Sequence, residues 1–101
     1  MSTVQIEVVS SLVETLDTDS RSDSAILEQE IEDGTNVREV LNRLSTRYPR
    51  FVEAVFDVRA QKLTERVNIF LNGCNLELVN GLSTNLSDGD SLTFIAPIIG
   101  G

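Results

Sequence analysis

The sequence predicts a single α+β domain, in which one main helix and a short second helix pack across a mixed sheet of four to five strands. Two observations carry this prediction. Apolar residues alternate with polar ones near both ends of the chain, whereas they recur at helical spacing in its middle. A chain of 101 residues with 41% hydrophobic residues also has room for one modest core. We therefore expect residues 1–101 to form one domain, with residues 97–101 as a flexible C-terminal tail.

The first half of the chain is expected to begin with two strands. Residues 4–9 alternate between apolar and polar side chains, which is the pattern of a half-buried strand. Residues 17–24 contain no apolar side chain and are expected to form an exposed loop. A second strand is expected over residues 25–31, and a turn at Asp33-Gly34 should end it.

The main helix is the clearest predicted element. Thr35 or Asn36 can cap it, and Asn36 with Glu39 has the spacing of a capping box. Tyr48-Pro49 should end it, because the residue before a proline is disfavoured in the α region. The residues expected on its buried face are Val37, Val40, Leu41, Leu44 and Tyr48.

Residues 51–62 join this helix to the second half of the chain. Their first part is rich in apolar side chains and predicts a short helix that caps one end of the core. The remainder is expected to be an irregular excursion that carries Arg59 and Lys62.

Three further strands are expected after this excursion. They are residues 67–72, a short return strand over residues 76–78, and residues 91–96. Asn72-Gly73 and residues 87–90 supply turns between them. The predicted core consists of Val4, Ile6, Val8, Val37, Leu41, Leu44, Ile69, Leu92 and Phe94.

Composition excludes several function classes. The formal net charge of -8 argues against nucleic acid and against anionic membrane surfaces, and it favours a protein partner with a basic docking face. With no histidine and a single cysteine, we expect no metal site and no active site of the chain's own. Cys74 follows a predicted turn and is expected to have no functional role. The N-terminus resembles no secretory signal, so we expect a cytoplasmic protein.

Strand parity predicts a docking face. If the alternate residues of the last two long strands face the core, Phe70 and Ile95 point outward as an exposed apolar pair on neighbouring strands. Pro97, Ile98 and Ile99 would extend this surface along the tail. Exposed apolar surface of this kind often marks an interaction site. The alternative is that a peripheral helix or loop covers the pair.

The chain ends in Gly100-Gly101. Since glycine makes up roughly 7% of average sequences, two terminal glycines arise by chance in about one chain in two hundred. Without Cβ atoms the pair can thread a narrow channel and adopt almost any backbone angle. We therefore expect the α-carboxylate of Gly101 to be the reacting group.

Three local patterns, in this order, carry a family resemblance. The first is Gly34-Thr35-Asn36-Val37, which opens a helix that ends in Arg47-Tyr48-Pro49. The second spans residues 67–73, and the third runs from residues 86–92 through Ala96-Pro97 to Gly100-Gly101. Together they resemble the ubiquitin-like β-grasp sulfur carriers of the MoaD/ThiS family, and they look most like MoaD-type and cysteine-synthesis carriers.

The resemblance implies a specific chemistry for the tail. An E1-like activating enzyme of the MoeB/ThiF type would use ATP to adenylate Gly101, and a sulfur nucleophile would then convert it to a thiocarboxylate. A sulfur-accepting synthase would take this sulfur in cysteine or molybdopterin synthesis. Gly100 would let the tail enter the enzyme's channel. The chain would bind no cofactor of its own and would be a protein co-substrate, not an enzyme.

Two other functions stay open. The chain could be a ubiquitin-like modifier whose activated Gly101 is transferred to lysines of target proteins, since the activation step is the same. It could also be a non-catalytic binding module in which the diglycine is incidental.

Overall fold

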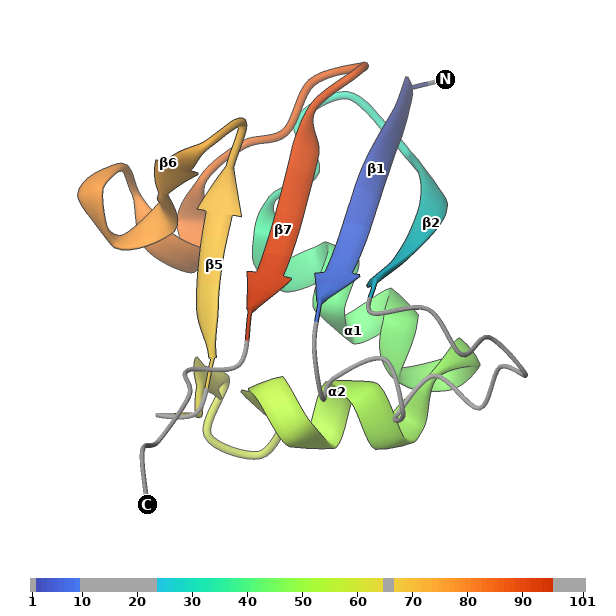
Figure 1. Cartoon of the computed structure of the whole chain (residues 1–101), viewed down its shortest axis with the longest axis vertical. Coiled ribbons are helices and arrows are strands. Elements are labelled where there is room, and N and C mark those ends of the chain that lie inside the picture. The colour runs from blue at the N-terminus through green and yellow to red at the C-terminus, as the bar shows by residue number, and fades with distance from the viewer. Residues whose placement is uncertain (1, 10–23, 65–66, 96–101) are drawn as a thin grey trace.

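The computed structural model describes residues 2–9, 24–64 and 67–95, and these form a five-stranded mixed sheet with helices on one side (Figure 1). The strands are β1 (Ser2–Val9), β2 (Ser24–Ile31), β5 (Asn68–Leu71), β6 (Cys74–Asn75) and β7 (Ser91–Ile95). Their order across the sheet is β2-β1-β7-β5-β6. β1 and β7 pair in parallel, whereas the other neighbours are antiparallel. The predicted mixed sheet is therefore confirmed.

The main helix α1 (Val37–Arg47) begins and ends where the sequence predicted. The Asn36 side chain accepts a hydrogen bond from the backbone N–H of Glu39 at 2.9 Å, which satisfies one of the unpaired donors of the first turn. At the other end, the backbone N–H of Tyr48 donates to the Leu44 carbonyl at 2.7 Å. Pro49 starts the second helix, α2 (Pro49–Val55), at a position where a missing N–H costs nothing.

The core lies between the sheet and the two helices. Every residue predicted for it is buried, and Phe51, Val52, Val55 and Phe56 of the second-helix region join it. The rings of Phe51 and Phe94 meet edge to face, with centroids 5.2 Å apart, so α2 packs directly against the central strand β7. Figure 1 looks onto the other side of the sheet, with α1 behind it.

The segment after α2 differs from the predicted irregular excursion. Two short strands, β3 (Phe56–Asp57) and β4 (Lys62–Leu63), pair as a separate antiparallel ribbon. Its turn is held by the Asp57 carboxylate, which accepts from the backbone N–H groups of Arg59 and Ala60 at 3.0 and 3.1 Å. Strands of two residues leave no periodicity in the sequence, which is why the prediction missed them.

The predicted return strand over residues 76–78 is wrong. The strand that pairs with β5 is β6, and Leu76–Leu78 form a 3-10 helix, η2, which is followed by a second one, η3 (Gly81–Ser83). Asn72 and Gly73 have φ angles of 50° and 85°, as a tight two-residue hairpin turn requires. Pairing therefore resumes at once, at Cys74. The Asn75 side chain then accepts from the Glu77 backbone N–H at 2.9 Å and starts the 3-10 turn.

Candidate functional site

Gly101, the predicted reacting group, follows strand β7 in the sequence, and the place of β7 in the sheet is well defined. Gly100 and Gly101, together with Pro97, Ile98 and Ile99, lie outside the described residues. The described chain ends at Ile95, the last residue of β7. β7 is hydrogen-bonded to β1 on one side and to β5 on the other, so the described chain ends on the middle strand of the sheet (Figure 1).

A network of hydrogen bonds fixes the start of β7. Asp88 accepts from the backbone N–H of Thr3 at 2.8 Å, and the backbone N–H of Gly89 returns a bond to the Thr3 carbonyl at 2.9 Å. The Asp90 carboxylate accepts from the backbone N–H of Ser87 at 2.8 Å and from the side-chain amide of Asn72 at 3.1 Å. Gly89 has a φ of 86°, which L side chains rarely adopt. The Asp-Gly-Asp turn thus ties β7 to the first strand and to the β5–β6 turn.

Phe70 and Ile95 lie on the sheet face opposite the core. Phe70 pairs with Thr93 and Asn68 pairs with Ile95, so Phe70 and Ile95 are diagonal neighbours on adjacent antiparallel strands. Their flanking residues Ile69 and Phe94 are buried, whereas Phe70 and Ile95 are each half-buried. No helix among the described residues covers this face (Figure 1). We call the side chains that project from it, on the side away from the core, the open face.

The strand register places one row of side chains across all five strands of the open face. Glu7 pairs with Ile26 on β2 and with Thr93 on β7, and Phe70 pairs with Thr93 and with Asn75 on β6. Val9 pairs with Ile95 and so adds an apolar side chain beside the row. The sequence singled out Phe70 and Ile95 but missed Glu7, Val9 and Ile26, because only the register brings them to the same surface.

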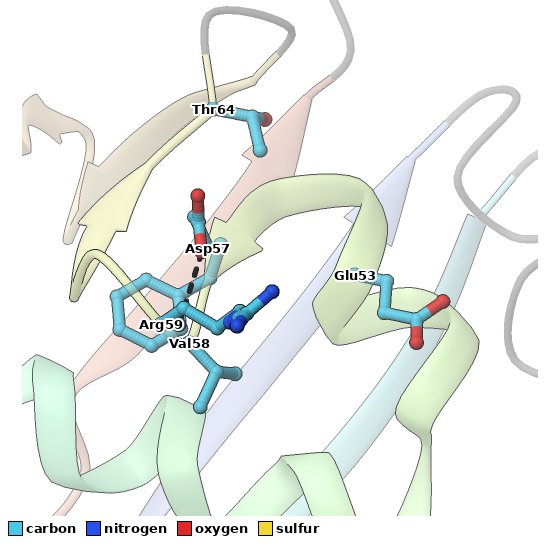
Figure 2. A pocket seen from close by; sticks show the side chains of 6 residues that line it. Glu53, Asp57, Val58, Arg59 and Thr64 are labelled. Carbon is cyan, nitrogen blue, oxygen red and sulfur yellow. Dashed lines mark hydrogen bonds between the residues drawn. The ribbon is translucent and has the colours of Figure 1, made fainter.

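A pocket of about 360 Å³ lies beside the β3–β4 ribbon and contains none of the predicted site residues (Figure 2). Its lining consists of Glu53, Phe56, Asp57, Val58, Arg59 and Thr64. Two of its polar groups make structural hydrogen bonds: Asp57 holds the turn of the ribbon, and the Thr64 hydroxyl donates to the Ala54 carbonyl of α2 at 2.9 Å. Figure 2 shows Glu53 projecting from α2, apart from the other labelled side chains.

Three further features of the described residues bear on possible chemistry: metal-ligating groups, the cysteine and the helices. No group of three or more metal-ligating side chains occurs in the described part of the chain. Cys74 is exposed and has a free thiol at the start of β6, next to the predicted turn. Of the helices within residues 24–64 and 67–95, none has the length and apolar character needed to cross a membrane.

Sequence and structural comparisons place the chain among known proteins. Residues 20–101 match the ThiS family. The sulfur carrier protein CysO of Mycobacterium tuberculosis is 32% identical over 69 residues, which are 67% of this chain and 74% of that protein.

Solved structures share the whole fold. The small archaeal modifier protein 1 of Methanosarcina acetivorans superposes with a TM-score of 0.74 at 27% identity, over 100% of this chain and 98% of that chain. A chain of the BexX/CysO complex of Amycolatopsis orientalis superposes with a TM-score of 0.65 at 22% identity, over 95% of this chain and 99% of that one. These likenesses confirm the predicted ubiquitin-like β-grasp fold.

Proposed function

The chain belongs to the ThiS family, as its sequence predicted, and we propose that it is a sulfur carrier that holds sulfur as a thiocarboxylate on Gly101. The observation that carries this proposal is the diglycine end, which follows within six residues of the central strand of a β-grasp sheet. A rigid sheet gives a partner a surface to hold, while two residues without side chains give the terminus clearance in a narrow active site.

The proposed chemistry has two steps. A carboxylate oxygen of Gly101 attacks the α-phosphorus of ATP, and pyrophosphate leaves. The sulfur of a sulfide then attacks the carbonyl carbon, and AMP leaves with the bonding electron pair. Adenylation is needed because an ionised carboxylate is a poor acyl donor, whereas AMP is a good leaving group.

We assign the catalytic groups to the partners and not to this chain. The sequence has no histidine and a single cysteine, so it lacks the usual nucleophile–base pairs. An activating enzyme of the MoeB/ThiF type would bind the ATP, and a sulfur-accepting synthase would take the sulfur into cysteine or molybdopterin synthesis. The chain itself would serve both enzymes as a co-substrate in the cytoplasm.

Phe70 and Ile95 are the residues on which we propose that the activating enzyme docks. They are half-buried on the open face, and Ile95 directly precedes the segment that carries Pro97, Ile98 and Ile99. An enzyme that covers this face would therefore receive the tail from the edge of its own docking site. Proximity of this kind converts the capture of the terminus into an intramolecular step.

The test is ATP-dependent activation of the purified chain. With the activating enzyme of the same organism, the wild-type chain should promote exchange of labelled pyrophosphate into ATP, and a variant lacking Gly100 and Gly101 should not. Equal exchange without the two glycines would contradict the proposal and would favour a binding module whose diglycine is incidental.

A ubiquitin-like modifier is the second candidate, favoured by the likeness to a small archaeal modifier protein. It would use the same adenylate but transfer Gly101 to lysines of other proteins. Covalent adducts of the chain with cellular proteins would support the modifier. Exchange of oxygen for sulfur at the terminus, without adducts, would support the carrier.

A further inference from the structure

Glu7 occupies an unusual place on the open face. It is the third of the four β1 residues on that side, and it lies between Ile26 of β2 and Thr93 of β7. Its neighbour along the strand, Val9, pairs with Ile95. The carboxylate of Glu7 thus has two apolar neighbours, Val9 and Ile26, on the surface that is proposed to dock the activating enzyme.

Nothing in the described structure neutralises this carboxylate. The described open-face side chains are Thr3, Gln5, Glu7, Val9, Ile26, Glu28, Glu30, Asn68, Phe70, Asn75, Ser91, Thr93 and Ile95. None of these side chains is basic. The ion pair between Arg43 and Glu32 lies outside this set. Among the described residues, Glu7 therefore has no ion-pair partner.

Docking changes the surroundings of this charge. Glu7 is already half-buried, unlike the exposed Gln5 on the same strand. Thr93 lies between Glu7 and Phe70 in a single row, so a protein that covers this row from Phe70 to Glu7 would also remove water from Glu7. A carboxylate buried without a partner costs far more free energy than an apolar contact returns. A wholly apolar docking surface would therefore bind poorly here.

We propose that the activating enzyme presents a basic side chain to Glu7, which lies between the apolar side chains of Val9 and Ile26 on the docking surface, so that Glu7 selects this partner. The inference rests on the proposed function, since it concerns the same docking event. The net charge of -8 agrees with a basic partner surface and would speed the encounter. Glu7 is a specificity residue and takes no part in the chemistry at Gly101.

The neighbouring strand offers a matched control. Glu28 projects from the same face, but it is exposed on the edge strand β2 and pairs with the exposed Gln5. Exposed charges at the rim of an interface are screened by salt and contribute little to affinity. Removing the charge of Glu28 should therefore matter much less than removing the charge of Glu7.

The experiment compares Glu7→Gln and Glu28→Gln with the wild-type chain. Affinity for the activating enzyme of the same organism is measured by calorimetric titration, and kcat/KM for adenylation by pyrophosphate exchange. We expect Glu7→Gln to weaken both on the order of 30-fold, the effect of removing one member of a buried charge pair, and Glu28→Gln to change them less than about 3-fold. Circular dichroism checks that both variants fold.

Each other outcome overturns the inference in a different way. Tighter binding by Glu7→Gln would mean that the surface of the enzyme that faces Glu7 is apolar. Unchanged binding would mean that Glu7 stays in water in the complex. If the wild-type chain is not adenylated at all, the proposed function fails first. If it is adenylated and Glu7→Gln behaves like the wild type, only this inference fails.

Discussion

The two faces of the sheet differ in how deeply their side chains are buried. On the covered face, Val4, Ile6, Val8, Leu92 and Phe94 are completely buried against the helices. On the open face, the residues between them are half-buried or exposed, and they include apolar, polar and acidic side chains. The same strands therefore carry stability on one side and the proposed partner recognition on the other, so substitutions on the two faces should separate folding from function.

The largest expected effect on stability comes from the covered face. Phe94→Ala removes a fully buried ring that packs against Phe51, and it should lower the free energy of unfolding by about 3–5 kcal/mol. Urea unfolding followed by circular dichroism measures this change. A loss of less than about 1 kcal/mol would mean that the core can close around the cavity.

A substitution in the tail should slow adenylation and leave the stability of the fold unchanged. Gly101→Ala adds a methyl group at the terminus, where the activating enzyme must align the carboxylate with ATP. We expect adenylation to slow on the order of 100-fold, as misplacement by about 1 Å does in other enzymes. The free energy of unfolding should stay at the wild-type value. Undiminished adenylate formation would refute the proposed fit.

Substitutions on the open face should weaken binding and leave the fold intact. Phe70→Ser and Ile95→Ser each remove part of the apolar pair, and each should reduce affinity for the activating enzyme by roughly 5- to 30-fold, as truncation of an apolar interface anchor does. Calorimetric titration gives the affinity. Their loss of stability should be well below that of Phe94→Ala. If the affinity is unchanged, the pair is not part of the docking surface.

The smallest predicted effect concerns the turn that precedes β7. Asp90→Ala removes acceptors for Ser87 and Asn72 at the start of β7, and it should cost about 1–2 kcal/mol of stability. Thermal unfolding detects this change. Adenylation should be unaffected at temperatures where the variant is folded. A large loss of adenylation in the folded variant would indicate that the turn also contacts the enzyme.

The sequence predicted the elements that have a strong local signal. Helical spacing and the Asn36 cap were enough to place α1, and strand alternation was enough to place β1 and β7 and their buried residues. The return strand was wrong because Leu76 and Leu78 alternate as strand residues do, whereas Asn75 directs the chain into a 3-10 turn.

The candidate site was predictable only in part. Strand parity alone predicted that Phe70 and Ile95 point away from the core, and the register of β5 with β7 confirms it. The position of Glu7 needs the pairing of β1 with both of its neighbours, and parallel pairing of β1 with β7 joins strands about 80 residues apart in the sequence. No local pattern carries that information.

Mass spectrometry can detect the proposed thiocarboxylate on Gly101. The chain is incubated with its activating enzyme, ATP and sulfide, and its intact mass and C-terminal fragments are measured. We expect one oxygen to be replaced by one sulfur, and this change to map to Gly101. An unchanged mass after complete ATP turnover, or sulfur located at Cys74 instead, would contradict it.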